Sequence, residues 1–569
     1  MIRLAALNAR YSHSCLALFH VRQELRAHLT ELQVEMLQLT INDPYFATLQ
    51  RLAVGEPAAV FFSVYIWNSR YVRRLVVDLV KLLPKTRIVL GGPQAPYLFS
   101  REQASWLPAR CSVVLGEVEG LSDDFYEDLV RDRMRELYGS FATVADSRAY
   151  PFVSPYLESD FSGDLCNRHV YYESSRGCPF ACSYCLSAAR PGVRYKELDQ
   201  VQAELAAILR HRPKVVRFVD RTFNDRPARA LAIWRFLLDT ADPATLFHFE
   251  MAPDRFTDEM LAFLEGMPVN RFQFELGIQS TNPETLSAIN RNMDLPKTRT
   301  AISRLAALDA IHLHVDLILG LPYETAATFA ASFNEVFALR PHYMQMGLLK
   351  VLPDTPMGRS ETEFELAVCE EPPYEVMANR WLDGAALAEL FWFGECVEAF
   401  YNNRFFRSLW RYLHGRGENV FTFFQSLLAV CQQQGFFELA ATQKLMVAIL
   451  CEFVAARSDG ELIRELLAYD WLRCGHRFLP VELQAGLQAE PLPTVKNTLW
   501  RRLPPNLEGL YDYRHRDEFF KQGIFACFSG PMLEAVGLGR DGQAGYVCFL
   551  AECEGRVFGL SRAVRLPVE

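Results

Sequence analysis

The run Gly177-Cys-Pro-Phe-Ala-Cys-Ser-Tyr-Cys185 places three cysteines, Cys178, Cys182 and Cys185, within one short segment of the chain. Thiolates are the ligands that iron-sulfur clusters select, and spacings of four and three residues let one loop surround a single cluster. Three thiolates on four irons leave one iron free to bind a reactant, whereas four would describe an electron carrier or a structural zinc site. The stretch therefore predicts a catalytic cluster, with a partial zinc site as the alternative.

The residues just before this stretch indicate its place in the fold. Val170-Tyr-Tyr-Glu-Ser-Ser175 is rich in strand formers, so the cysteines follow the carboxyl end of a strand, where α/β barrels build active sites. With Tyr184 before Cys185, the segment resembles the CxxxCxΦC signature of the radical S-adenosylmethionine (SAM) superfamily. The resemblance implies a 4Fe-4S cluster on the three cysteines, SAM chelated by its open iron, reductive cleavage of SAM to a 5′-deoxyadenosyl radical, and a cofactor-binding role for Tyr184.

Strand and helix patterns alternate through residues 165 to 360. Six runs have the composition of strands, at residues 170–175, 214–219, 247–250, 271–277, 313–319 and 343–349. Six parallel strands with crossover helices predict a partial (β/α)6 barrel of the TIM type, whose strand ends bring distant residues into one pocket.

Several of these strand ends also match the radical SAM core. Glu275-Leu-Gly-Ile-Gln-Ser280 resembles the fourth-strand segment that meets SAM, and the run from Asp316 to Glu324 resembles the fifth-strand segment beside its adenine. The resemblance implies SAM contacts at Glu275, Gln279, Ser280, Asp316 and Gly320. The segment Asp220-Arg-Thr-Phe-Asn224 resembles the second-strand segment near the substrate. Taken alone, each strand-end carboxylate is as often a helix cap or an ion-pair partner.

Residues 1 to 140 show a second alternation, with strand-like runs at residues 2–7, 33–39, 58–64, 86–90 and 111–115. Helix-length segments such as 14–29 and 69–83 separate them. This order predicts a Rossmann-like, doubly wound parallel sheet with a ligand crevice beyond the carboxyl ends of its strands. The loops there supply the ligand-binding candidates Asn8, Tyr11, Ser12, Tyr65, Trp67, Asn68, Gly91, Gly92, Pro93, Gly116 and Glu117. Paired glycines let the backbone approach a ligand, and the rings of Tyr65 and Trp67 suit a flat one.

The turn Gly91-Gly-Pro93 and the segment Gly116-Glu-Val-Glu119 resemble the cobalamin-binding domain that precedes many radical SAM cores. The resemblance implies cobalamin as a third cofactor. The Asp-x-His-x-x-Gly run that supplies a lower axial histidine in other corrinoid proteins is absent, so His13 is either a cobalt ligand or a polar, hydrogen-bonding residue of its loop. A Rossmann-like sheet that has lost its cofactor is the alternative for the whole domain.

The pattern changes from residue 365 onward. Segments 385–405, 420–434 and 437–457 carry apolar residues at helical spacing, which predicts a mainly α-helical C-terminal domain over residues 365–569. Runs at 544–550 and 556–560 predict a small hairpin, and the acidic segment 361–371 predicts a linker. The domain resembles an extension of uncharacterised cobalamin-type radical SAM proteins, which implies a role in choosing the substrate.

Composition limits the partners and the compartment. The 569 residues are 50% hydrophobic and carry a net charge of -9, so nucleic acid bound by broad phosphate neutralisation is not an expected partner. Apolar runs are too short for a membrane helix, and the N-terminal one breaks at Asn8 and Arg10, too early for a signal peptide. The scattered cysteines outside the motif suit a reducing compartment. We therefore expect a cytoplasmic protein with no membrane partner.

These features together predict a cobalamin-dependent radical SAM enzyme. The resemblance implies C-methylation of an unactivated carbon in a small-molecule or peptide substrate, with electrons from a donor such as flavodoxin or ferredoxin. The alternatives are rearrangement, cyclisation or oxidation without methyl transfer, a transfer RNA methylthiotransferase-like enzyme, and a cobalamin or iron-sulfur sensor. The methylthiotransferase requires three further cluster cysteines, and before Cys178 the chain offers only Cys15, Cys111 and Cys166, in separate segments.

Overall fold

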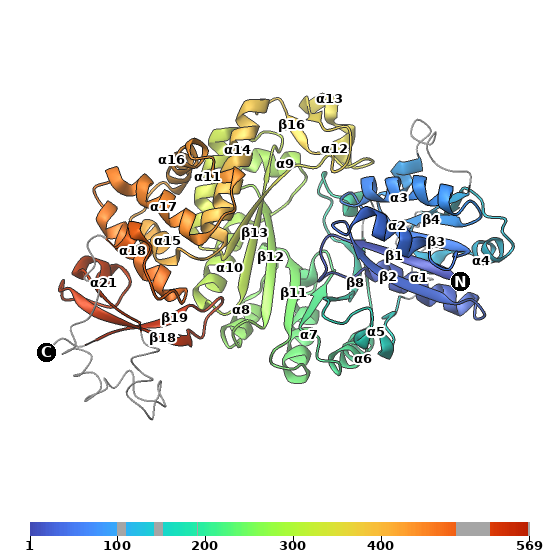
Figure 1. Ribbon diagram of the computed structural model, residues 1–569, viewed down its shortest axis with the longest axis horizontal. Helices are drawn as coiled ribbons and strands as arrows, with labels where there is room; N and C mark the ends of the chain where they lie inside the picture. The colour runs from blue at the N-terminus through green and yellow to red at the C-terminus, as the bar shows by residue number, and fades with distance from the viewer. Residues whose placement is uncertain (100–109, 141–151, 190–191, 485–523, 567–569) are drawn as a thin grey trace.

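The computed structural model describes residues 1–99, 110–140, 152–189, 192–484 and 524–566. Figure 1 shows three parts along the long axis: an N-terminal α/β part, a central parallel sheet with its helices, and a group of C-terminal helices beside a small sheet. The predicted α/β class and its helical C-terminal portion are confirmed. Within the described ranges, every helix is too short or too polar to span a lipid bilayer.

The N-terminal part is a six-stranded sheet with the order β2-β1-β3-β4-β5-β6, in which all paired strands are parallel. Its strands are β1 (Ile2–Asn8), β2 (Val34–Thr40), β3 (Ala59–Ser63), β4 (Arg87–Gly91), β5 (Cys111–Leu115) and β6 (Leu137–Gly139). Its helices are α1 (Leu16–His28), α2 (Tyr45–Ala53), α3 (Ser69–Leu82) and α4 (Asp123–Val130). All five predicted strands are present, and the three-residue β6 was not predicted.

Alternate side chains of β1 pack into two separate apolar cores. Leu4 lies in a core with Leu18 of α1, whereas Ala5 lies in a core with Val72 of α3. Helices therefore cover both faces of the sheet, as the doubly wound pattern predicts. The strand order reverses between β1 and β3, and the carboxyl ends of these two strands flank the crevice that such a switch point creates.

The central sheet has the sequential order β14-β13-β12-β11-β10-β7 and is also parallel at every pairing. Its strands are β7 (Val170–Tyr172), β10 (Val215–Phe218), β11 (Leu246–Met251), β12 (Phe272–Gln279), β13 (His312–Leu319) and β14 (Tyr343–Leu348). The outer helices are α6 (Leu198–Leu209), α7 (Pro227–Thr240), α8 (Asp258–Glu265), α9 (Pro283–Ala288), α10 (Leu295–Leu308) and α11 (Ala326–Ala338). The sheet stays open between β7 and β14, so the predicted six-stranded partial barrel is confirmed.

The cysteine stretch lies in a hairpin beside this barrel. β8 (Ser175–Cys178) pairs antiparallel with β9 (Gly192–Tyr195), and the cysteine loop joins them. Gly177 has a φ of +100°, and a Cβ there would lie 2.1 Å from the carbonyl oxygen of Gly192. Only glycine fits this close approach of the two strands. The predicted strand at 170–175 is therefore shorter than expected and is followed by a second, antiparallel strand.

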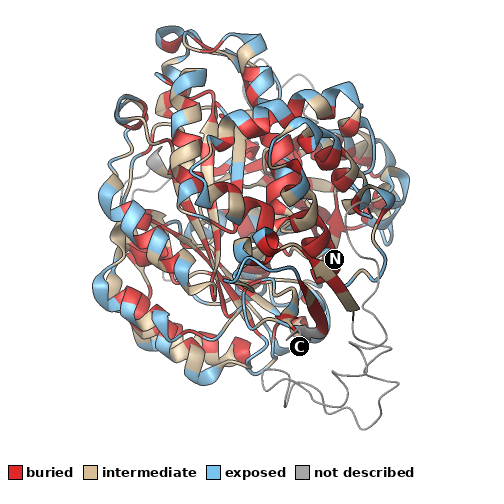
Figure 2. Ribbon diagram, turned by 90° about the vertical axis from the view of Figure 1, so that its left-hand side faces the viewer, coloured by how far each residue is buried: buried red, intermediate tan, exposed pale blue. Residues whose placement is uncertain are grey.

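The C-terminal helices are α14 (Gly384–Val397), α15 (Arg407–Gly415), α16 (Val420–Gln433), α17 (Gln443–Phe453) and α18 (Gly460–Arg473). Of these, α14, α15 and α16 pack on α11 of the barrel through aromatic contacts, such as the rings of Phe333 and Phe393 with centroids 4.8 Å apart. In Figure 2 the sides of these helices that face inward are buried and the outward sides are exposed. Residues 485–523 of the predicted helical domain lie outside the described residues.

The small sheet corrects the predicted hairpin. It has three antiparallel strands, β17 (Ile524–Phe528), β18 (Gly545–Cys553) and β19 (Ser561–Arg565), and a short helix α21 (Gly530–Ala535). The predicted second strand at 556–560 is wrong because these residues form the turn, in which the Glu554 amide bonds to the Leu560 carbonyl. β17 was not predicted.

The expected linker at 361–371 is also wrong, because this segment is folded. It forms α13 (Glu361–Phe364) after α12 (Pro356–Arg359), and β15 (Ala367–Val368) pairs with β16 (Val376–Ala378). Glu371 lies 2.6 Å from Arg70, and Tyr374 accepts a hydrogen bond of 2.5 Å from Gln94. We call residues 361–378 the bridging segment, since it ties the barrel to the N-terminal part.

Candidate functional site

The three motif cysteines lie around a cavity of about 230 Å³ at the carboxyl ends of the barrel strands. Cys178 ends β8, and Cys182 and Cys185 follow in the loop; the first two are buried and Cys185 is partly exposed. Predicted SAM or cluster neighbours share this cavity, namely Tyr184, Glu275, Gln279 and Asp316. Further walls come from Phe180, Arg221, Thr222, Glu250, Met251, Gly277 and Arg291.

Backbone contacts hold the cysteine loop in place. The Ser183 amide donates to the carbonyl of Ile289 at 2.9 Å, and the Ser183 carbonyl accepts from the amide of Met357 at 2.9 Å. The Asn290 side chain donates to the carbonyl of Ala181 at 2.8 Å. The loop is therefore fixed by residues that follow α9 and begin α12, which are distant in sequence.

Two polar side chains approach the sulfur atoms. Arg291 lies with one guanidinium nitrogen 3.6 Å from Cys182 Sγ and another donating to the Gly277 carbonyl at 2.5 Å. Thr222 Oγ1 lies 3.5 Å from Cys178 Sγ. Burial raises the pKa of the Cys178 thiol, and the Thr222 contact opposes that shift. Such hydrogen bonds around thiolate ligands tune and orient a cluster.

Two carboxyl groups in the same cavity each have a histidine partner. Glu275 Oε2 lies 3.1 Å from His248 Nε2, and Asp316 Oδ1 lies 3.0 Å from His314 Nε2. Burial acts to raise the pKa of Glu275, but the hydrogen bond from His248 together with the charges of His248, His314 and Arg217 lowers it overall. For Asp316 burial prevails over the His314 contact, and the pKa is raised. The cavity thus presents polar groups held in fixed positions.

The remaining predicted SAM contacts separate into two groups. Gln279 lines the cavity at the bulge that ends β12 and has a φ of +74°, a strained conformation that is typical of functional sites. Ser280, by contrast, is buried outside the described cavity wall and donates to Glu324 Oε1 at 2.7 Å. Gly320 faces the bridging segment, since a Cβ there would lie 2.6 Å from Val376 Cγ1.

The segment predicted to lie near the substrate supports the strand ends. Asp220 is buried and accepts hydrogen bonds from the hydroxyls of Ser174 and Ser175, both at 2.6 Å. Asn224 is buried and bonds both backbone groups of Ala252, at 2.8 and 2.9 Å. These two side chains hold neighbouring strand ends together, and the residues between them that reach the cavity are Arg221 and Thr222.

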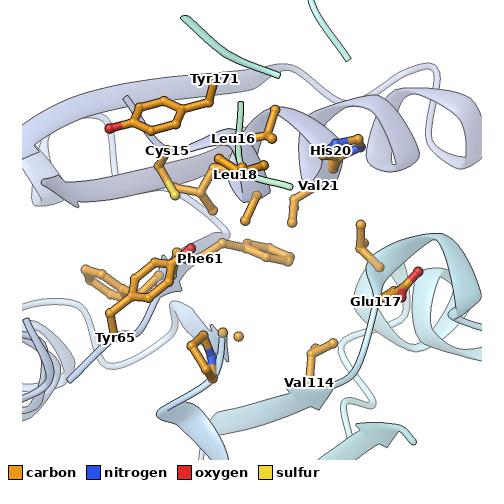
Figure 3. Close-up of a pocket in the computed structure, with 18 of the residues that line it drawn as sticks. Cys15, Leu16, Leu18, His20, Val21, Phe61, Tyr65, Val114, Glu117 and Tyr171 are labelled. Atoms are coloured by element: carbon orange, nitrogen blue, oxygen red, sulfur yellow. The ribbon is translucent and has the colours of Figure 1, made fainter. Parts of the chain in front are cut away.

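A larger cavity of about 570 Å³ lies between the switch point of the N-terminal sheet and the start of the barrel. Most of the ligand-binding candidates of the first domain line it, namely Asn8, Tyr65, Trp67, Asn68, Gly91, Gly92, Pro93, Gly116 and Glu117. Figure 3 shows side chains of α1, β3 and β5 around its centre, including Leu18, Phe61 and Val114. The predicted crevice therefore exists, and much of its wall is apolar.

The turns at the mouth of this cavity have conformations that explain their residues. Asn68 is buried and caps the turn, accepting from the Tyr65 amide at 2.8 Å and donating to the Ser63 carbonyl at 3.0 Å. Gly92 has a φ of +98°, and a Cβ there would lie 2.7 Å from the Val64 carbonyl oxygen. A Cβ on Gly91 would meet no atom within 4 Å, so Gly91 leaves open space in the cavity wall.

Aromatic rings stand at the same mouth. The rings of Tyr65 and Trp67 stack with centroids 4.2 Å apart and an interplanar angle of 10°, and Trp67 is 50% exposed. Tyr11 and Ser12 do not reach the described wall: the Tyr11 ring packs under the Arg168 guanidinium at 4.1 Å, and the Ser12 carbonyl accepts from the His169 amide. Two of the predicted loop residues thus contact the barrel instead.

His13 lines the large cavity with one ring nitrogen already engaged. Its Nδ1 lies 2.7 Å from the hydroxyl of Tyr171. Burial, and then the nearby Arg217 and Arg10, lower the pKa of His13, so its ring is neutral at physiological pH. This contact agrees with the hydrogen-bonding role, and cobalt ligation by His13 stays a prediction.

A buried ionic cluster that was not predicted docks the N-terminal part onto the cysteine hairpin. Arg176, two residues before Cys178, contacts Glu117 at 2.8 Å, Glu119 at 2.7 Å and Glu173 at 2.9 Å. Burial opposes ionisation of Glu173, but Arg176 and His20 lower its pKa to about 2. The cysteine hairpin is thereby held against the floor of the large cavity.

The two cavities share a wall. Arg221, after β10, and Glu250, in β11, line both of them, and their side chains approach to 3.8 Å. Burial raises the pKa of Glu250 to about 7, against the opposing effect of Arg221. Neither residue was a predicted site residue, although Arg221 stands in the segment 220–224 that resembles the second-strand segment near the substrate.

The three motif cysteines are expected to bind a cluster and not a single metal ion. Among the residues with described positions, no three His, Cys, Asp or Glu side chains converge as ligands of one ion. A 4Fe-4S cluster differs because each cysteine binds a different iron, so the thiols surround a volume instead of a point.

Comparison with known families agrees with this geometry. Residues 172–336 match the radical SAM superfamily, so the chain contains a radical SAM domain. Residues 362–503 match a family described as a protein of unknown function (DUF4080), which covers the C-terminal helices.

Two curated methyltransferases resemble part of the chain. The chain is 27% identical over 357 residues to the cobalamin-dependent radical SAM methyltransferase TokK of Streptomyces tokunonensis, covering 56% of this chain and 51% of that protein. It is 24% identical to the 2-(S-pantetheinyl)-carbapenam-3-carboxylate methyltransferase of Streptantibioticus cattleyicolor, covering 68% and 64%. The matched parts thus span about half to just under two thirds of these relatives.

A solved structure shares the fold. The cobalamin-dependent S-adenosylmethionine radical enzyme OxsB with aqua-cobalamin bound aligns with a TM-score of 0.56 and 14% identity, covering 82% of this chain and 80% of that one. At this identity the likeness concerns the fold alone.

Proposed function

We propose that this protein, whose residues 172–336 form a radical SAM domain, is a cobalamin-dependent radical SAM enzyme that methylates an unactivated carbon of its substrate. The observation that carries the proposal is the pair of cavities that share Arg221 and Glu250. One cavity has the thiols for a cluster, and the other has the volume and the loops for a large flat cofactor. A reaction that needs both cofactors requires such neighbouring sites.

The smaller cavity fits a 4Fe-4S cluster with SAM. Cys178, Cys182 and Cys185 would hold the cluster, and the polar groups of Glu275 and Gln279 would meet SAM. The larger cavity fits cobalamin, because Gly91 leaves open space and Tyr65 and Trp67 present stacked rings. When bound, these groups supply one-electron cleavage of SAM and a carrier for its methyl group.

The chain's own residues would bind and orient the ligands and would keep water away from them. The apolar wall formed by Leu18, Phe61 and Val114 would exclude water from the larger cavity. Glu250, with a pKa of about 7, can hold or release a proton near neutral pH. Together with Arg221, it would hydrogen-bond a ligand that reaches the junction of the two cavities.

The proposed chemistry also implies a partner protein and a cellular compartment. Cleavage of SAM needs single electrons, so we expect an external donor such as flavodoxin or ferredoxin in a reducing cytoplasm. A methylthiotransferase-like function has no support in the geometry: Cys15 lines the large cavity, Cys111 is buried in β5 and Cys166 is exposed, so these three cannot hold a second cluster together.

The test is turnover without knowledge of the substrate. Anaerobically reconstituted protein, loaded with hydroxocobalamin, would be incubated with SAM and a strong reductant, and two products would be quantified. We expect 5′-deoxyadenosine and S-adenosylhomocysteine, and we expect omission of cobalamin to remove only the second. Deoxyadenosine without S-adenosylhomocysteine in the cobalamin-loaded protein would contradict methyl transfer and favour a rearrangement, cyclisation or oxidation.

A further inference from the structure

A third cavity, of about 370 Å³, lies at the opposite end of the barrel from the cysteines. Asp309 and His342, which line it, precede β13 and β14, whereas Asp316 in β13 belongs to the cysteine cavity. Asp316 is the fifth residue of β13, so it lies about 13 Å along the strand from the first residue, His312. Its other walls are α15 and the turn before β19, which Figure 1 shows near the foot of α10.

The charge of this cavity is strongly unbalanced. Its wall contains five arginines, no lysine and a single carboxylate, Asp309. The arginines are Arg340, Arg404, Arg407, Arg411 and Arg556. Asp309 is engaged by His342 at 3.1 Å and by Arg556 at 3.6 Å. Within the described part of the chain, the other four arginines form no ion pair.

The fold holds these guanidinium groups without neutralising them. Arg407 donates to the backbone carbonyls of Val557 at 2.7 Å and Phe558 at 3.3 Å, and Arg404 donates to that of His342 at 3.3 Å. Arg404 Nε is buried with no hydrogen-bond partner among the described residues. Burial and the neighbouring Arg404 lower the pKa of Arg407 to about 10. Positive groups gathered this closely are costly unless an anion joins them.

We propose that this cavity binds a small phosphate-bearing molecule between α10, α15 and the turn before β19. The guanidinium group is planar and binds phosphate oxygens in pairs, which explains why every cation in the wall is an arginine. The unpaired Nε of Arg404 is the donor that a phosphate oxygen would satisfy. The site is separate from the reaction site and joins the barrel to the C-terminal helices.

The consequence for the molecule is mechanical as well as electrostatic. Arg340, which follows α11 of the barrel, lines the same cavity as the arginines of α15 and Arg556 of the turn at 554–560, so a shared anion would fasten the C-terminal helices to the barrel. Because a ligand that binds only the folded state stabilises it, binding would raise the thermal unfolding midpoint. This inference does not depend on the proposed methyl transfer.

The experiment is calorimetric titration of the full-length protein with inorganic pyrophosphate and, separately, with adenosine monophosphate, at low salt. We expect saturable binding of about one molecule per chain that weakens as salt is added. Tighter binding of pyrophosphate would identify an inorganic ligand, and tighter binding of the monophosphate an organic one. Both probes carry the phosphate group that the proposal requires.

Variants locate the binding. Arg411→Gln and Arg340→Gln change exposed arginines of the wall, so folding should survive, and each should weaken binding by about tenfold. Arg299→Gln, an exposed arginine of α10 that pairs with Glu335 outside the cavity, is the matched control and should bind as the unaltered protein does. Absence of saturable binding of either probe, or equal binding by the two wall variants and the control, would overturn the proposal.

Discussion

The two cavities that meet at Arg221 and Glu250 are built differently, although both arise at the carboxyl ends of parallel strands. In the N-terminal part the strand order reverses, and the cavity is shaped by turns such as Gly91-Gly92 and by apolar side chains. In the barrel the strand order is sequential, and the cavity is lined by thiols, carboxyl groups and Arg291. A switch point thus provides a volume, whereas a barrel mouth provides chemical groups.

This difference predicts how each site fails. The cysteine cavity should lose its cofactor when one ligand atom is removed. The larger cavity should lose its cofactor when an added side chain fills its volume.

The largest effect should follow removal of a thiol. In Cys182→Ala one iron loses its ligand, and we expect 5′-deoxyadenosine formation to fall by more than about 100-fold, because even outer-shell changes cost 10- to 100-fold. Iron content and deoxyadenosine are measured together. Cys166→Ala, which alters an exposed cysteine away from both cavities, should keep both. Full activity of Cys182→Ala would remove the cluster assignment.

The second-largest effect should follow from filling the larger cavity. Gly91→Leu adds a side chain where a Cβ meets no neighbour within 4 Å, so the fold should tolerate it while the cavity loses volume. We expect retained cobalt to drop by about tenfold or more. A tenfold drop in affinity corresponds to a loss of about 1.4 kcal/mol of binding free energy. Iron and deoxyadenosine should change little.

Gly555→Leu is the matched control for this variant. Gly555 is exposed, its Cβ would also meet nothing within 4 Å, and it lies far from the large cavity in the turn after β18. Cobalt retention should be unchanged there. Equal cobalt in Gly91→Leu and in the unaltered protein would show that cobalamin is not held in this cavity.

The shared wall should respond to pH. Burial raises the pKa of folded Glu250 to about 7, above its value in the unfolded chain. Its contribution to stability is therefore full below the unfolded pKa of about 4.3 and is lost as the pH rises through about 7. The side chain of Gln in Glu250→Gln does not titrate. The thermal midpoint of this variant minus that of the unaltered protein should therefore rise with pH over this range and stay constant at higher pH.

The control for the pH series is Glu363→Gln, at an exposed position of α13. Its midpoint should follow that of the unaltered protein at every pH. A difference between Glu250→Gln and the unaltered protein that does not vary with pH would contradict the buried titration.

The smallest effect concerns the docking of the two parts. Tyr374→Phe removes the hydrogen bond of 2.5 Å from Gln94 to the bridging segment. We expect the free energy of unfolding to fall by about 1 kcal/mol, the usual net value of one hydrogen bond. Denaturant titration measures it, with Tyr323→Phe, on a partly exposed ring, as control. An unchanged value would mean that this contact does not hold the two parts together.

Sequence reasoning reached the barrel and its cysteine cavity more fully than the rest. The cysteine spacing located Cys178, and the resemblance of the runs 275–280 and 316–324 to the radical SAM core implied Glu275 and Asp316 as lining residues. Gln279 was predicted as well, although its positive φ was not. Periodicity reports which face of a strand is buried, and that is enough to place a strand-end residue.

What the sequence missed depends on contacts between segments far apart in the chain. Nothing near Arg176 signals that it would meet Glu117 and Glu119, and nothing near Glu250 signals that two cavities would meet there. Ser280 was predicted as a cofactor contact, but the hydrogen bond from its hydroxyl to Glu324 was not predicted. Such pairings are set by how the two sheets dock, which no local pattern encodes.

The most direct test of the central claim is the metal content of one preparation. Anaerobically reconstituted protein is incubated with hydroxocobalamin and desalted, and iron and cobalt per chain are measured with the corrinoid absorbance spectrum. Two adjoining cofactor cavities predict about four iron atoms and about one cobalt atom per chain, retained together. Iron retained without cobalt would contradict the account and leave the larger cavity without its cofactor.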